Sequence, residues 1–164
     1  MLYLRNMNED EFPAYVDYFV ADYGIEIKAS YNKTTEQALE IARNEIKNDL
    51  PHGVHTKGNF LLCIELEKKE RRSTIGYLWY ARNDDEMSAF IDDFYIFPDY
   101  RHEGYARKSI AILEKSLADS GIKEIRLRVA YSNEIALALY KKAGFITTGI
   151  NMAKNIVKEE ENQQ

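Results

Sequence analysis

The segment from Phe94 to Lys108 joins an apolar strand to a helix and has the features of a phosphate-binding turn. A helix N-terminus presents unpaired backbone N–H groups and a partial positive charge, which together suit a phosphate. Gly104 lets a ligand approach the backbone closely and permits positive φ. The basic residues of the turn, set against the single acid Glu103, are Arg101, His102, Arg107 and Lys108. The alternative is an ordinary strand-to-helix turn on a charged surface.

Two consecutive aspartates, Asp92 and Asp93, interrupt the strand that precedes this turn. Strands disfavour Asp, and burial of a carboxylate costs free energy. Because side chains alternate along a strand, the pair is predicted to lie on opposite faces. One of them could then face a cleft and bind a cation or accept a proton there. The alternative is a strand-end acid that pairs with Arg126 or Arg128 on the next strand.

Other chemistries have weaker support in the sequence. The single cysteine, Cys63, excludes an internal disulfide and a cysteine-rich metal cage, and its apolar surroundings predict a packed core thiol. His52 and His55 lie three apart in a predicted loop, which is a weak pattern for a metal site, and we expect no metal. No Ser/His/Asp set is apparent that could act in nucleophilic catalysis.

Hydrophobic periodicity predicts the elements that position these residues. Strands are expected at Leu2–Arg5, Phe60–Leu66, Thr74–Tyr80, Ala89–Phe97, Ile125–Val129 and Phe145–Ile150, with a short seventh as an option at 152–156. Helices are expected at Phe12–Tyr23, where Gly24 ends the first, at Thr35–Leu50, at Gly104–Ser120 and directly after Asn133. This order predicts a mixed sheet with helices on its faces, an α/β (α+β) fold.

Length and composition fit one soluble domain. The 164 residues carry a formal net charge of −5, which argues against a nucleic-acid binder because such a protein needs a basic surface. The N-terminus becomes polar too early for a signal peptide, and no run of 18 apolar residues could span a membrane. We therefore expect a cytoplasmic protein with a single domain at 1–158 and a frayed polar tail at 159–164.

Two segments resemble the signatures of the GNAT superfamily of acetyl-CoA-dependent N-acetyltransferases. Arg101–Ala106 resembles the pattern Arg/Gln-x-x-Gly-x-Gly/Ala, and Asn133–Phe145 resembles Asn-x-x-Ala-x-x-x-Tyr-x-x-x-Gly-Phe. The apolar strand that ends at Pro98 is similar to the strand before the family's turn. The resemblance implies a mostly antiparallel sheet of six or seven strands, splayed at the cofactor site and flanked by about four helices.

The resemblance also implies a site for acetyl-CoA, used as a co-substrate. Its pyrophosphate would bind the turn, which comprises Arg101, His102, Glu103, Gly104, Tyr105, Ala106 and Arg107. The backbone of Phe94, Tyr95 and Ile96 would pair with the pantetheine arm and the acetyl carbonyl, and Asn133 would lie near that arm. From the residues alone, core packing is the alternative for Phe94 and Ile96, and helix capping the alternative for Asn133.

Tyr140 matches the family tyrosine that protonates the departing thiolate, with core packing as the alternative. A phenol with a pKa near 10 can donate a proton to a thiolate with a pKa near 8.5 when the two are within hydrogen-bond reach. For the base, the candidates are Asp92 and Asp93, because Arg128 stands where some relatives carry a glutamate.

The resulting hypothesis is an N-acetyltransferase that moves the acetyl group to a primary amine by direct attack in a ternary complex. The acceptor would be a small-molecule or peptide amine, with neither nucleic acid nor membrane as a partner, and the resemblance allows a homodimer. The alternative is a non-catalytic CoA-binding or sensor module on the same fold.

Overall fold

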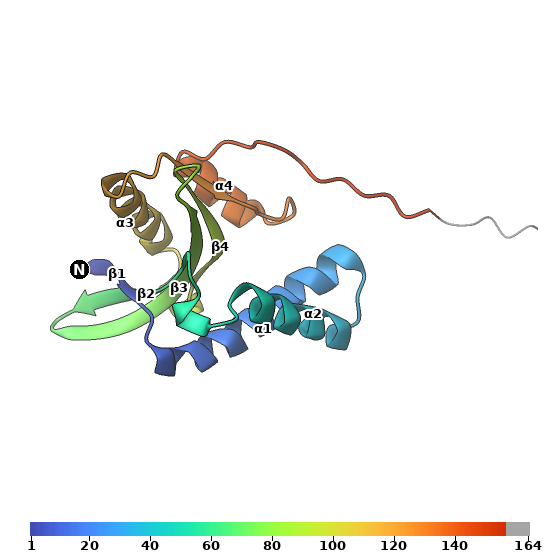
Figure 1. Ribbon diagram of the computed structural model, residues 1–164, viewed down its shortest axis with the longest axis horizontal. Helices are drawn as coiled ribbons and strands as arrows, with labels where there is room; N and C mark the ends of the chain where they lie inside the picture. Colours follow the sequence, from blue (N-terminus) through green and yellow to red (C-terminus); the bar gives the residue numbers. More distant parts are fainter. Residues whose placement is uncertain (157–164) are drawn as a thin grey trace, which may run out of the picture. The chain divides into compact units, whose positions relative to one another are not determined.

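The computed structural model describes residues 1–156, and the chain divides into two compact units. The first unit runs from Met1 to Arg128, and the second begins at Val129 (Figure 1). The predicted polar tail at 159–164 lies outside the described residues. Among the described residues, no helix is long and apolar enough to cross a membrane.

The first unit is built on a five-stranded sheet in the order β1-β2-β3-β4-β5. Its strands are β1 Leu2–Asn6, β2 Asn59–Lys68, β3 Arg71–Asn83, β4 Ser88–Ile96 and β5 Glu124–Leu127, and its helices are α1 Phe12–Tyr31, α2 Thr35–Asp49 and α3 Tyr105–Asp119. The first four strands pair antiparallel with their neighbours, and β5 pairs parallel with β4. The predicted mixed, mostly antiparallel sheet is confirmed, and residues 1–156 contain the four helices expected, the fourth being α4 Glu134–Lys142 in the second unit.

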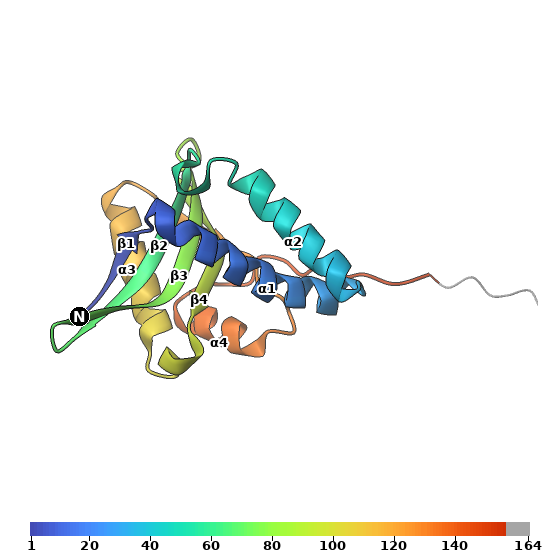
Figure 2. The ribbon, with the colours of Figure 1, turned by 90° about the horizontal axis from the view of Figure 1, so that it is seen from below.

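Helices cover both faces of this sheet, as Figure 2 shows for α1 and α2 on one side and α3 on the other. Side chains alternate along a strand, so each face supplies its own apolar layer. One layer joins Ile64, Leu78 and Ile91 to Leu113 and other residues of α3. The other layer joins the opposite face to α1 and α2, and its members include Tyr15, Phe19, Ala42, Cys63 and Trp79. Cys63 is fully buried with a free thiol, as its apolar run predicts.

One predicted helix boundary and two predicted strands were wrong. The first helix does not end at Gly24 but continues to Tyr31, because this glycine packs against α2: a Cβ added to it would lie 2.9 Å from Leu39 Cδ2. The predicted strands at Phe145–Ile150 and 152–156 are irregular, so residues 1–156 contain five strands rather than six or seven. A β-branched run favours a strand only when a neighbour pairs with it, and the described residues give this run none.

The splay predicted for the sheet is visible in the pairing of β4. Its residues Ser88–Ile91 pair with β5, whereas Asp93–Ile96 pair only with β3. The second half of β4 therefore has one backbone edge that no other strand of the sheet uses. That edge leads directly into the turn before α3.

Gly76 on β3 allows close approach of the backbone of β4 at this place. A Cβ added to Gly76 would lie 2.1 Å from the carbonyl oxygen of Tyr95, so the two strands would have to separate. We expect Gly76→Ala to lower the free energy of unfolding by about 3 kcal/mol, the upper range for overpacking. Urea unfolding measures the change. Gly149→Ala is the control, since its Cβ would meet nothing within 4 Å, and equal stability of the two variants would contradict the expectation.

Candidate active site

A β-bulge in β4 places both aspartates on the same side of the sheet. Trp79 of β3 pairs with Asp93 and the next residue, Tyr80, pairs with Ile91, so Asp92 is the extra residue of the bulge. Bulges re-aim side chains and are frequent next to active sites. The prediction that Asp92 and Asp93 lie on opposite faces was therefore wrong, because regular alternation is interrupted between them. Both line one cavity.

Asp93 accepts hydrogen bonds from two tyrosines of α1. The hydroxyl of Tyr15 donates to Oδ2 at 3.0 Å, and that of Tyr18 donates to Oδ1 at 3.1 Å. The alternative of a pairing with Arg126 or Arg128 is wrong, since Arg126 binds Glu124 and Glu86, and Arg128 donates to the hydroxyl of Tyr31. The sequence offered only the three-residue spacing of the two tyrosines on a helix as a signal for their joint role.

Burial raises the pKa of Asp93 to about 7, an increase limited by the hydrogen bonds from Tyr15 and Tyr18. Partial desolvation inside the cavity also raises the pKa of Asp92, an exposed residue, to about 7, with repulsion from the carboxylates of Asp49 and Glu45 acting in the same direction. A carboxyl group with a pKa near neutrality can both accept a proton and release it at the working pH of most enzymes. These values make the two aspartates suited to proton transfer.

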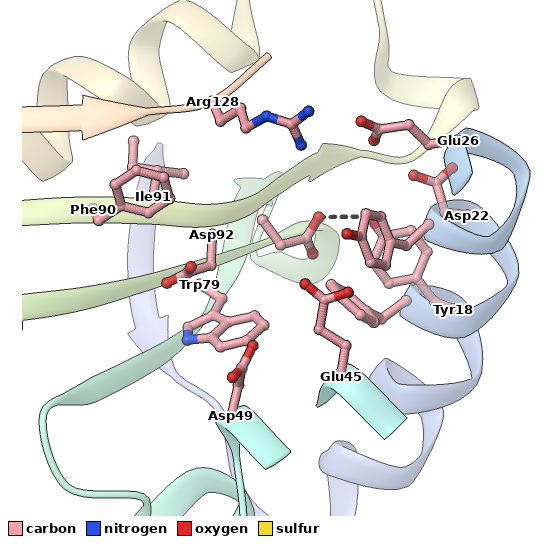
Figure 3. Close-up of a pocket in the computed structure, with 13 residues that line it drawn as sticks. Tyr18, Asp22, Glu26, Glu45, Asp49, Trp79, Phe90, Ile91, Asp92 and Arg128 are labelled. Carbon is pink, nitrogen blue, oxygen red and sulfur yellow. Dashed lines mark hydrogen bonds between the residues drawn. The ribbon is translucent and has the colours of Figure 1, made fainter. Parts of the chain in front are cut away.

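The cavity has a volume of about 190 Å³ and lies within the first unit (Figure 3). Its walls combine aromatic rings with six carboxylates and one guanidinium. The lining residues are Tyr18, Phe19, Asp22, Tyr23, Glu26, Glu45, Asp49, Trp79, Phe90, Ile91, Asp92, Asp93 and Arg128. The carboxylates come from three elements, namely α1, α2 and β4.

The raised pKa of Asp92 predicts a pH-dependent stability. An acid whose pKa rises on folding stabilises the protein below its unfolded pKa near 4, and this contribution is lost as the pH rises toward 7. Asp92→Asn removes the titration, so we expect the variant to be more stable than the wild type by about 1 kcal/mol at about pH 8, after allowance for solvent screening. The difference should vanish near about pH 4.

Melting temperatures at the two pH values test this expectation. The same substitution at Asp85, an exposed carboxylate in the β3–β4 turn, serves as the control. A lower melting temperature of Asp92→Asn than of wild type at the higher pH would contradict it.

The turn before α3 leaves the helix N-terminus open. His102 and Gly104 both have positive φ, at 65° and 76°, and Gly104 is the N-cap residue without a side-chain hydrogen bond to the helix. A Cβ at Gly104 would meet nothing within 4 Å, so the space in front of the first helical amides is open. No acidic side chain stands in the first turn of α3. This geometry fits an anion such as a pyrophosphate.

Arg101 fastens this turn to the end of β4. Its Nε donates to the carbonyl oxygen of Ile96 at 2.8 Å, and its guanidinium lies 5.0 Å from the centre of the Tyr95 ring. Phe94 and Ile96 pack in the core layer beneath α3, as their packing alternative predicts, and Tyr95 lies on the other face with its ring 4.3 Å from that of Tyr18.

The remaining predicted cofactor residues follow in the same continuous segment. Tyr105 is buried, Ala106 packs against the core, and Glu103 and Arg107 are exposed.

Asn133 and Tyr140 belong to the second unit. The Asn133 Oδ1 accepts a hydrogen bond from the backbone N–H of Ala136 at 3.1 Å, so this residue caps α4 as the capping alternative predicts. The ring of Tyr140 contacts that of Phe145 edge-on, with 5.6 Å between the ring centres. Gly144, with φ of 97°, allows the chain to turn after the helix and bring the two rings together.

The model of the Acetyltransferase (GNAT) family matches residues 12–145, well over half of the chain. The chain belongs to the GNAT family of acetyltransferases. The match includes β4, the turn at Gly104 and the helix of Tyr140, so both predicted signatures lie within the family region. The recognition from two short motifs is confirmed, and this GNAT acetyltransferase is an acyltransferase enzyme.

Similar proteins match this chain over nearly its whole length. The N-acetyltransferase YycN of Bacillus subtilis (strain 168), itself uncharacterized, is 29% identical over 155 residues, which cover 93% of this chain and 97% of that protein. The crystal structure of YycN has a TM-score of 0.87 and covers 96% of this GNAT chain and 100% of its own. The PaiA N-acetyltransferase from Thermoplasma acidophilum, solved with coenzyme A, shares the fold with a TM-score of 0.69 at 17% identity, over 92% of this chain and 93% of its own.

Proposed function

We propose that this GNAT enzyme transfers the acetyl group of acetyl-CoA to a primary amine, by direct attack of the amine while both substrates are bound. The observation that carries the proposal is the position of β4. This single strand contributes two carboxylates to a cavity, leaves its backbone edge open, and continues into a turn suited to an anion. Residues 1–158 would act as one N-acetyltransferase domain.

Acetyl-CoA would supply the acetyl group as a thioester. On the enzyme, the open amides at the start of α3 and the basic side chains around Gly104 suit its pyrophosphate. The free edge of Phe94–Ile96 offers backbone donors and acceptors to an extended chain, in the manner of an added strand. Arg101 supports this role indirectly, because it holds the carbonyl of Ile96 and fixes the end of the strand.

On the acceptor side, Asp93 would bind the incoming ammonium and take its proton. An amine attacks a carbonyl only when neutral, so a base must remove one proton. Each carboxylate oxygen has two lone-pair positions, which leaves acceptor capacity beside the hydrogen bonds from Tyr15 and Tyr18. These two phenols also fix the direction of the carboxylate. Asp92, on the adjacent bulge position, adds a second negative charge to the same cavity.

Tyr140 would donate its phenolic proton to the departing sulfur, and Asn133 would lie along the pantetheine arm. The family match supports both roles, since it includes the segment from Asn133 to Phe145. The capping bond of Asn133 uses one lone pair of Oδ1 and leaves its Nδ2 group available as a donor.

Gly104→Val tests the turn. The side chain would occupy the open space before the first helical amides, and we expect the Kd for acetyl-CoA to rise at least about tenfold. Gly121→Val is a matched control at the other end of α3, because Gly121 also has positive φ, 85°, and open space around it. The strain of the two substitutions is similar, so equal acetyl-CoA affinities by calorimetry would speak against the turn as the binding site.

A thiol-release assay tests the activity as a whole. Purified protein with acetyl-CoA and a panel of primary amines is expected to release free CoA and form one N-acetyl product per thiol. Acetyl-CoA alone should raise the melting temperature, because a ligand of the folded state stabilises it by mass action. Binding of acetyl-CoA without turnover of any amine would refute the proposed function and favour a binding module.

A further inference from the structure

We infer that the acceptor is a slim alkyl amine with at least two ammonium groups, one of which reacts while another is held by carboxylates of α1 and α2. The inference rests on the proposed N-acetyltransferase function and adds the substrate class. It is based on the cavity described above, which is lined by aromatic rings and by one pair of carboxylates from each of α1 and α2.

The carboxylates on the two helices are spaced by one turn. Asp22 and Glu26 are four residues apart on α1, and Glu45 and Asp49 are four residues apart on α2. Residues at this spacing share one helix face, and like charges there destabilise an isolated helix. Figure 3 shows both pairs directed toward the same space as Asp92. Each of the two helices thus carries a pair of like charges that faces the cavity.

Cations of the protein compensate this charge only in part. Within residues 1–156, no ion pair joins Asp22, Glu26 or Asp49 to a lysine or arginine. Burial raises the pKa of Asp22 and of Glu26, and the more distant charges of Arg101 and Arg128 respectively lower it. A bound cation would relieve the repulsion among these groups, and a second ammonium has several carboxylates available to it.

The aromatic walls point independently to a cation on an alkyl chain. Tyr18, Tyr23, Trp79 and Phe90 line the cavity, and Phe90 is 40% exposed although it lies on a strand. Ring faces attract ammonium groups and also pack against methylene groups. A wholly polar ligand such as a hydrated metal ion would gain little from these rings. The cavity of about 190 Å³ is also smaller than the roughly 300–1,000 Å³ of sites for drug-sized ligands, which favours a narrow chain over a bulky polycyclic amine.

The cavity offers separate carboxylates to the two ends of such a ligand. Asp93 lies on β4, whereas the acidic pairs lie on α1 and α2. A short diamine could therefore place one ammonium near Asp93 and the other beside the acidic pairs. A monoamine of equal length would lose the second interaction.

Steady-state kinetics with putrescine and n-butylamine test the inference, since the two have the same carbon chain and differ by one amine. We expect kcat/KM to be at least about tenfold higher for putrescine, and the ratio to fall when the NaCl concentration is raised to about 0.5 M. Asp22→Asn and Glu45→Gln should each lower the ratio. Their matched controls on the same helices, Asp17→Asn and Glu40→Gln, replace exposed carboxylates outside the cavity and should leave it unchanged.

Equal kcat/KM for the two amines would overturn the inference and leave the proposed function intact, because both amines would still be acetylated. Acetylation of a peptide amine in the same panel, with neither alkyl amine turned over, would have the same meaning. Failure of acetyl-CoA to stabilise the protein, together with no turnover of any amine, would instead refute the proposed function. An equal drop in the ratio for Asp22→Asn and Asp17→Asn would overturn the assignment of the second ammonium to the cavity.

Discussion

Asp93→Asn is expected to lower kcat/KM by about 10²- to 10⁴-fold, the range typical for loss of a general base. The amide keeps the size of the side chain but cannot take a proton from the ammonium. It also removes the charge that would hold the incoming cation. Stopped assays of N-acetyl product at about pH 8 measure the loss, because the carboxylate of the wild type is ionised there.

Two controls separate this chemistry from a structural effect of Asp93. The Kd for acetyl-CoA should stay within about twofold of the wild-type value, since the cofactor turn is not altered. Asp85→Asn, in the exposed β3–β4 turn, should retain full activity. An Asp93→Asn variant that binds acetyl-CoA and acetylates amines at the wild-type rate would remove Asp93 from the mechanism.

Tyr140→Phe is expected to reduce kcat by about 10²-fold or more, because the phenol proton that would neutralise the departing thiolate is lost. The ring remains, so its edge-on contact with Phe145 can be kept. We therefore expect little change in the affinity for acetyl-CoA. Pre-steady-state measurement of thiol release shows whether the chemical step itself is slower.

Tyr131→Phe is the matched control in the same unit, because Tyr131 is 75% exposed and lies outside α4. It should leave kcat unchanged. If both tyrosine variants retain full activity, another group or a water must protonate the leaving sulfur.

The sequence was informative where function depends on local backbone geometry. The turn at Gly104 could be recognised because a positive φ, an uncapped helix start and surrounding basic residues all arise from neighbours along the chain. The same holds for Asn133, whose capping bond reaches only to Ala136. The positions of the five strands in the first unit also followed from short hydrophobic runs.

What could not be predicted depends on contacts between distant segments. The bulge at Asp92 arises from the register of β4 against β3, and a regular period of two gave the wrong face for one aspartate. The hydrogen bonds of Tyr15 and Tyr18 to Asp93 span more than 70 residues of sequence. Gly24 was interpreted as a helix end because glycine commonly ends helices. Its packing against Leu39 depends on the neighbouring helix, so the residues around Gly24 gave no sign of it.

The pH dependence of kcat/KM for wild type and Tyr18→Phe tests the central claim most directly, namely that the tyrosine-held Asp93 is the base of an amine acetyltransferase. We predict that log kcat/KM falls below an apparent pKa of about 7 in the wild type. In Tyr18→Phe the apparent pKa should be higher, because one hydrogen bond that favours the ionised carboxylate is gone. An apparent pKa that is identical in the two proteins, or a profile without this acidic limb, would contradict the assignment.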